Sequence, residues 1–405
     1  MLTTGLVLAN LTISLTGEKV DGKVRQTQLF TATNVLDIVL VLGMTALIFA
    51  IKATSKKQKI FTPQTNITIL AFLYMLVPAY LTRHEYGSGA LLQQVFSITE
   101  WIVRVALCSA LLNYPRRMTF DESMLVVRYF LKWSSVLCVV IITLLTVVDR
   151  NLTFLPTGVL SFGGFALHPN KLSVMCSLGI MAWLDDTKSK QSYWIVLILL
   201  LVTVATGSRS GLVTSLFAVA YGLIGRFPPR AQPMLMFGLA IVSIFYLILL
   251  SLGVGSLNAV SGRDVSITDL NNRDAVWDAS KVMISMRPWI GWGWLEGPAL
   301  IGDYMNQGWW HARNAQNDFM NFWVASGIGG FIICIVIYGT TALVGFGHAR
   351  KIGNRLVLGT IIIVTVSAVF EPILSMRANI VGTSLLLVWL AAAQSLSPPK
   401  KNHRS

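Results

Sequence analysis

Residues 232–253 read QPMLMFGLAIVSIFYLILLSLG, a run of 22 residues that contains no charged side chain. A helix rises about 1.5 Å per residue, so about 20 apolar residues cross a hydrocarbon layer about 30 Å thick. The apolar residues are continuous instead of alternating, which favours a helix over a strand of a membrane barrel. This run therefore predicts a transmembrane helix.

Similar runs recur along the chain, and 54% of its residues are hydrophobic while only 12% are charged. Soluble domains carry about twice that charged fraction. Residues 1–16, which lack the charged start of a signal sequence, add a short twelfth candidate. We expect an all-α, polytopic membrane protein with about 12 transmembrane helices. The other runs lie at 33–52, 66–82, 93–113, 129–148, 158–184, 193–206, 210–225, 318–346, 355–374 and 379–396.

The net charge of +14 is explained by topology, and it does not indicate nucleic-acid binding. If the predicted spans alternate in direction, 18 Lys and Arg residues fall on one side and far fewer fall in the short loops of the other. The positive-inside rule places the basic side, with both termini, in the cytoplasm. Its residues are Lys52, Lys56, Lys57, Lys59, Arg116, Arg117, Arg128, Lys132, Lys188, Lys190, Arg226, Arg230, Arg350, Lys351, Arg355, Lys400, Lys401 and Arg404.

The longest polar stretch covers residues 254–317 on the external side, and a connector of this length is usually functional. We therefore divide the chain into N-terminal transmembrane helices at 1–253, a large periplasmic loop at 254–317, and C-terminal helices with a cytoplasmic tail at 318–405. The four cysteines lie within apolar runs without metal-ligand or pairing spacing, which predicts buried core residues and no metal site.

Charged residues inside apolar runs mark candidate sites, because a charge is costly in a bilayer unless it is paired or hydrated. Glu100 and Arg104 lie one helical turn apart, and an internal salt bridge or a transporter's coupling site would explain them equally well. His168 and Lys171 flank a proline near the outer end of one run, and Glu371 lies near the outer end of another.

Arg209 lies in the external turn Thr206-Gly207-Ser208-Arg209-Ser210-Gly211. A guanidinium group stays charged and binds phosphate oxygens through two N–H groups, although an arginine here also fits a simple anchor at the lipid headgroups. The 254–317 loop combines arginines with many tryptophans, which suit either the membrane interface or stacking on sugar rings. These residues are Arg263, Arg273, Arg287, Arg313, Trp277, Trp289, Trp292, Trp294, Trp309 and Trp310.

Four short motifs between about residues 160 and 390 resemble the family of O-antigen ligases and O-antigen polymerases. They are His168-Pro169-Asn170, Gly207-Ser208-Arg209-Ser210-Gly211, Asn272-Arg273-Asp274-Ala275-Val276-Trp277 with Arg287-Pro288-Trp289-Ile290-Gly291-Trp292-Gly293, and Gln316-Asn317 with Gly327-Ile328-Gly329-Gly330. Each motif is weak alone, and their shared order and external location carry the resemblance.

The resemblance implies a GT-C-like glycosyltransferase of the bacterial inner membrane whose active site faces the periplasm. Such enzymes take a glycan from undecaprenyl diphosphate and transfer it to an acceptor hydroxyl, without a metal or another cofactor. Residues matching Arg209 and Arg273 bind the diphosphate, and we add Arg287, Arg313, Asn317, His168, Lys171 and Glu371 as candidates for substrate binding. A flippase and a chain-length regulator are further expected partners.

The family has a histidine where this chain has Gln316, and an amide is no general base near neutral pH. His311, five residues upstream, or Asp318 are the alternatives for the catalytic base. The departure favours a polymerase of surface polysaccharide (O-antigen, capsule or exopolysaccharide). Direct attack by the acceptor hydroxyl would invert the anomeric carbon. The alternatives are a ligase acting on lipid A-core or another acceptor, and, in another class, a secondary transporter or flippase.

Overall fold

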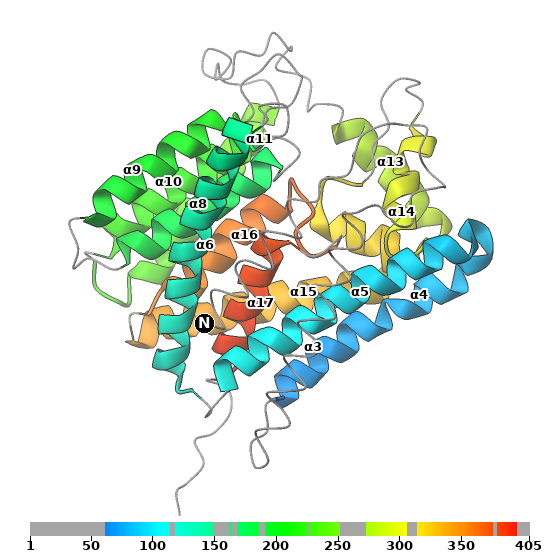
Figure 1. The fold of residues 1–405 in the computed structure, drawn as a ribbon, viewed down its shortest axis with the longest axis horizontal. Helices are drawn as coiled ribbons and strands as arrows, with labels where there is room; N and C mark the ends of the chain where they lie inside the picture. The colour runs from blue at the N-terminus through cyan, green and yellow to red at the C-terminus, as the bar shows by residue number, and fades with distance from the viewer. Residues whose placement is uncertain are drawn as a thin grey trace, which may run out of the picture.

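The computed structural model describes residues 61–113, 118–148, 162–163, 168–185, 191–225, 227–251, 273–305, 314–352, 354–375 and 379–394. Helices dominate this part of the chain (Figure 1). In chain order they are α3 (Pro63–Tyr74), α4 (Leu76–Leu81), α5 (Arg83–Asn113), α6 (Phe120–Val148), α8 (Pro169–Leu184), α9 (Gln191–Ala205), α10 (Arg209–Ile224), α11 (Gln232–Ser251), α13 (Arg273–Met286), α14 (Glu296–Ala299), the 3-10 helix η1 (Leu300–Tyr304), α15 (Asp318–Ile352), α16 (Leu356–Ala368) and α17 (Ile380–Ala393).

Each predicted run from 66–82 onward overlaps one of these helices, except that α3 and α4 share the first. The bounds differ in places: α6 begins nine residues before the run 129–148, α8 begins at Pro169 within the run 158–184, and α16 ends at Ala368 within the run 355–374. Four stretches are long and apolar enough to cross a membrane: Pro63–Leu81, Leu91–Asn113, Phe120–Val147 and Asp318–Lys351. Shorter apolar helices accompany them within the described residues. The chain is thus a helical membrane protein, while the count of 12 spans stays a prediction and the runs at 1–16 and 33–52 lie outside the described residues.

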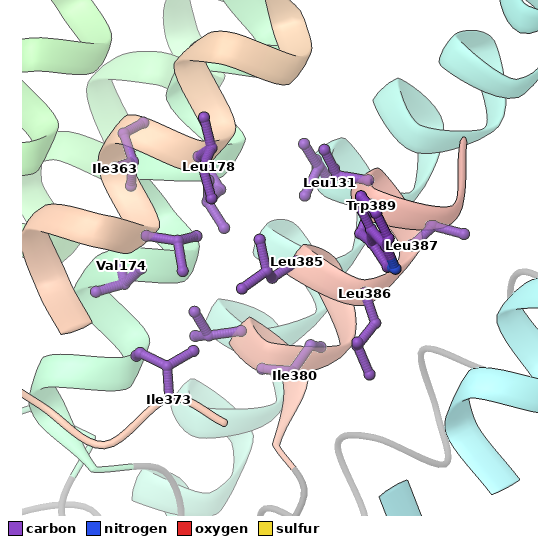
Figure 2. Packing of buried hydrophobic residues seen from close by; sticks show 14 of the residues in the cluster. Leu131, Val174, Leu178, Ile363, Ile373, Ile380, Leu385, Leu386, Leu387 and Trp389 are labelled. Carbon is purple, nitrogen blue, oxygen red and sulfur yellow. The ribbon is translucent and has the colours of Figure 1, made fainter. Parts of the chain in front are cut away.

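The centre of the bundle is formed by α8, α16 and α17, whose side chains are buried almost all round. Such uniformly apolar helices are expected inside a bundle. Leu385 of α17 lies among Val174 and Leu178 of α8 and Ile363 of α16 (Figure 2). The four cysteines are buried and free, as predicted.

The parallel helices α8 and α10 lie against each other along their length. Ser173 contacts Gly211, Ser177 Oγ lies 2.8 Å from Ser215 Oγ, and Leu184 lies against Gly222. The two residues of each pair are 38 positions apart in the sequence, so the helices run in the same direction. Small side chains allow this close approach, as is common between membrane helices. Both helices therefore begin at the same end of the bundle, which we call the site end.

The other described helices fit the same alternation. Asp318 at the start of α15 contacts residues 373–375, between α16 and α17, and Glu371 of the same loop contacts Asn170 in the first turn of α8, so these termini also lie at the site end. At the opposite end, Arg128 near the start of α6 contacts Asp185, which follows α8. The described residues that make these contacts thus divide between two ends of the bundle as their predicted sides do, while most of the basic residues of the predicted cytoplasmic side lie outside the described residues.

Helix α15 is broken at Ser326 and Gly327, where φ of Gly327 is +63°. The segment 288–293 fills the break: Trp292 N donates to Val324 O (2.8 Å), Gly293 N to Ala325 O (2.9 Å), and Ile328 N to Pro288 O (2.8 Å). An interrupted helix is tolerated in a membrane protein when other backbone groups satisfy its free carbonyls. Two of the sequence motifs, at 287–293 and 327–330, therefore hold each other in place.

Candidate functional site

The first turns of α8 and α10 bring three of the candidate residues to the site end. His168 caps α8, where its Nδ1 accepts a hydrogen bond from Asn170 N (3.4 Å), and Lys171 lies in the first turn. Arg209 begins α10 after a turn in which Gly207 has a φ of +64°. Ser208 Oγ accepts from Gly211 N (3.1 Å), which fixes the start of the helix. His168 is exposed, and Lys171 and Arg209 are half-buried.

The loop 369–375, between α16 and α17, is held by Asp318. The Asp318 carboxylate is fully buried and accepts hydrogen bonds from the backbone N–H groups of residues 373, 374 and 375 at 2.9–3.1 Å. Tyr338 donates its hydroxyl to the same carboxylate at 2.9 Å. A carboxylate so occupied and so far from solvent is suited to fixing a loop, and it has no exposed oxygen with which to take a proton from an acceptor.

The same loop connects α8 with α15. Asn170 donates its side-chain amide to Glu371, which is 8% exposed. Asn317 caps α15 by accepting from Met320 N (3.0 Å), and its amide donates to Val369 O (3.0 Å). Of the predicted site residues, Glu371 thus lies on this loop and Asn317 contacts it. Asn170 connects the loop to the start of α8, where His168 and Lys171 lie.

The segment 314–317 is fixed from both sides. Ala315 N donates to Asn321 Oδ1 (2.6 Å), while Ala315 O accepts from Trp277 Nε1 of α13 (3.0 Å). Gln316 has a φ of +48°, the one positive φ of a non-glycine residue in the described ranges. A glutamine in this region is strained by about 1 kcal/mol, and such outliers concentrate at functional sites.

Arg273 begins α13 one helical turn before Trp277. The hydrogen bond from Trp277 to Ala315 therefore places the start of α13 beside the Gln316 segment. The side chain of Arg273, His311 and Arg313 lie outside the described residues. Arg287 lies elsewhere in the motif region, with its guanidinium carbon 4.1 Å from the centre of the Trp292 ring.

Glu100 and Arg104 are both buried within α5, at 2% and 1% exposure. Arg104 Nη1 donates to Thr383 Oγ1 of α17 at 2.9 Å. At the site end of α5, Gln94 Oε1 accepts from Trp294 N (2.6 Å), so this helix also holds the 291–294 turn. No group of three or more metal-ligating side chains occurs among the residues that the structure describes.

The sequence motifs did not identify several residues that hold the site together. Asn321 and Tyr338 act through contacts across 6 and 20 residues, and Trp277, which did stand in a quoted motif, acts across 38. Asn170 was also part of a quoted motif, and the signal that could have found Asn321 was its polar character within an apolar run. The predicted candidates that the structure does bring to one end are His168, Lys171, Arg209, Asn317, Asp318 and Glu371, together with Gln316.

The O-antigen ligase family model matches residues 194–335. This confirms the resemblance seen in the motifs, and the matched region contains Arg209, Arg273, Arg287 and the segment 316–318. His168, Lys171 and Glu371 lie outside it. The search of curated proteins gave no match. The chain therefore carries a domain of the O-antigen ligase family within a multi-pass membrane protein.

Proposed function

We propose, from the O-antigen ligase domain and the grouping at the site end, that this protein polymerises a surface polysaccharide. It would transfer a glycan from undecaprenyl diphosphate to a hydroxyl of an acceptor sugar, at the periplasmic face of the inner membrane. The observation that carries the proposal is the convergence of the starts of α8, α10, α13 and α15 around the loop 369–375.

Helix starts favour anions because their free N–H groups and aligned dipoles carry partial positive charge. Arg209 begins α10, Arg273 begins α13, and Lys171 lies in the first turn of α8. We propose that Arg209 and Arg273 bind the donor diphosphate and that Lys171 adds a third positive charge. His168 and Arg313 would contact the same headgroup. Arg287, stacked on Trp292, would support the site through the segment 287–293.

The reaction would proceed by direct displacement. The acceptor oxygen attacks the anomeric carbon, the bond to the diphosphate oxygen breaks with its electron pair, and the configuration inverts. Permanent guanidinium charges would stabilise the leaving diphosphate as its negative charge develops, without a metal ion. Preorganised charges in a partly dry site are worth about 3 kcal/mol each, or about 100-fold in rate.

The proton of the acceptor hydroxyl needs a base, and His311 is our candidate. Imidazole titrates near neutral pH, whereas the Gln316 amide does not. We assign Asp318 to positioning, because its carboxylate is buried and occupied by the loop 369–375. Gln316, Asn317 and the Glu371 carboxylate would bind acceptor hydroxyl groups by hydrogen bonds.

Replacing the two arginines tests the diphosphate site. Arg209→Ala and Arg273→Ala should each lower polymer yield about 100-fold at unchanged membrane levels of the protein. Arg230→Ala is the matched control, because Arg230 is exposed at the opposite end of the bundle. Full-length polymer in both arginine variants would refute the assignment.

A second pair of variants tests the base. His311→Ala should abolish polymer, whereas Gln316→Ala, which removes only hydrogen bonds, should lower it by about 10-fold. Wild-type polymer levels in the His311→Ala variant would exclude His311 as the catalytic base, and an acidic side chain would then be the candidate.

The product that accumulates separates polymerase from ligase. A polymerase mutant leaves single repeat units on the carrier lipid, whereas a ligase mutant leaves long polymer there. Uptake driven by an ion gradient in reconstituted vesicles would instead support the transporter alternative.

A further inference from the structure

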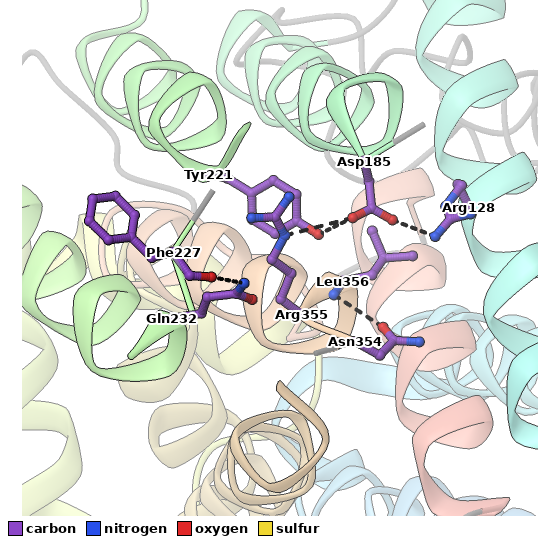
Figure 3. A network of polar contacts seen from close by, with 8 residues as sticks. All are labelled: Arg128, Asp185, Tyr221, Phe227, Gln232, Asn354, Arg355 and Leu356. Carbon is purple, nitrogen blue, oxygen red and sulfur yellow. Dashed lines mark hydrogen bonds and ion pairs between the residues drawn. The ribbon is translucent and has the colours of Figure 1, made fainter. Parts of the chain in front are cut away.

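A second polar cluster lies at the end of the bundle opposite the site end. Asp185 Oδ2 lies 2.5 Å from Arg128 Nη2, Asp185 Oδ1 accepts from the Tyr221 hydroxyl (2.8 Å), and Arg355 Nε lies 3.8 Å from the same oxygen (Figure 3). The Arg355 guanidinium carbon also lies 4.2 Å from the centre of the Tyr221 ring. The cluster joins α6, α8, α10 and the residue before α16.

Among the described residues, the positive charges of this cluster outnumber its negative charges. Two guanidinium groups share the single carboxylate of Asp185, which is the acidic partner of both within the described residues. Arg355 is 8% exposed, and its Nη1 and the Nε of Arg128 are buried donors that make no hydrogen bond in the described part of the chain. A buried N–H group without an acceptor is costly, so the cluster is suited to a further anion.

The surroundings of the cluster indicate the source of that anion. The Arg128 side chain is 28% exposed, which gives access from the outer surface of α6. Beside it, α6 exposes Tyr129 and Trp133, and farther along the same helix it exposes Val140 and Leu144. Tyrosine and tryptophan are enriched at the depth of lipid headgroups, and an apolar stripe beyond them suits an acyl chain.

We propose that Arg128 and Arg355 form a binding site for the phosphate of an anionic phospholipid. The phosphate lies beside the Asp185 carboxylate, accepts the guanidinium N–H groups that Asp185 leaves without an acceptor and offsets the excess positive charge, while an acyl chain follows the exposed face of α6. Basic pockets between helices bind anionic headgroups in this way. The site is independent of glycan transfer, because it lies at the other end of the bundle.

Lipid binding to the full-length protein in a nonionic detergent tests the site, with native mass spectrometry as the readout. The wild-type protein should retain phosphatidylglycerol in preference to phosphatidylcholine. Arg128→Gln and Arg355→Gln should each weaken phosphatidylglycerol binding about fivefold, the loss expected for one cation near a lipid surface. Arg230→Gln, which removes an exposed arginine at the same end, should leave it unchanged.

A charge-preserving variant separates a defined site from general attraction. A Cβ atom at Gly225 would occupy the position of the Arg355 guanidinium, so Gly225→Ala should weaken phosphatidylglycerol binding with no change in net charge. If Arg355→Gln does not fold, Arg128→Gln and Gly225→Ala decide the question.

Three outcomes would overturn the proposal. They are equal binding by the wild-type protein and the Arg128→Gln and Gly225→Ala variants, equal retention of the two phospholipids, and full displacement of phosphatidylglycerol by millimolar inorganic phosphate. The last would identify a site for free phosphate in place of a lipid.

Discussion

At the scale of single residues, the most consequential side chain is Asp318. The sequence offers it as a possible base, yet its four hydrogen-bond donors make it the anchor of the loop 369–375. That loop carries Glu371 and receives Asn317, so the loss of one carboxylate would disorder two candidate substrate contacts.

We predict that Asp318→Ala destabilises the protein by about 3 kcal/mol, because it leaves buried N–H groups without an acceptor. Thermal unfolding in detergent would show a lowered Tm, and polymer would be lost. Tyr338→Phe, which removes one donor from the same carboxylate, should cost only about 1 kcal/mol. An unchanged Tm in Asp318→Ala would contradict the anchoring role.

At the scale of helices, the break in α15 depends on Gly327. Its φ of +63° is unfavourable for other residues, and a Cβ atom there would collide with Trp289 O in the inserted segment. Gly327 of the motif 327–330 is therefore explained by backbone packing.

Gly327→Ala should lower stability by about 2 kcal/mol or more through strain and overpacking. Gly339→Ala in the same helix has open space around the added methyl group, and should raise stability by about 0.5–1 kcal/mol. The two Tm values should shift in opposite directions. A Gly327→Ala protein as stable as Gly339→Ala would show that the interlock with 288–293 is absent.

The close contact between α8 and α10 leads to a prediction about polymer yield. A Cβ atom at Gly211 would collide with Ser173, so Gly211→Ala should push the start of α10, with Arg209, away from Lys171. Polymer yield should fall at least about 10-fold, because small misplacements of a binding group are costly. Gly238→Ala in α11, where the methyl group meets nothing, is the matched control. Equal polymer yields from Gly211→Ala and Gly238→Ala would show that activity does not depend on the position of Arg209 relative to Lys171.

At the scale of the whole molecule, the separation into two ends predicts which residues each compartment reaches. The native cysteines are buried, so new ones can be labelled against a low background. Asp303→Cys, exposed in η1 at the site end, should react with an impermeant maleimide in spheroplasts. Arg230→Cys should react only after the membrane is permeabilised. The reverse pattern would place the site end in the cytoplasm.

The sequence by itself determined the class of the protein and the approximate positions of its long apolar helices, although not their limits. Continuous apolar runs demand helices in a bilayer, and they predicted every long helix from α5 onward except α13 within the described residues. The order of the motifs also predicted the family. These properties depend on local composition, which the sequence contains directly.

Only the tertiary structure decided how the site is assembled. Asp318 fixes the loop 369–375, and Trp277 bonds to Ala315, so residues from separate elements are joined. The left-handed backbone of Gln316 occurs in the segment that these contacts hold. The sharing of Asp185 by Arg128 and Arg355 has the same origin. Such contacts depend on which helix faces meet, and a pattern of apolar residues in a fully buried helix does not specify its neighbours.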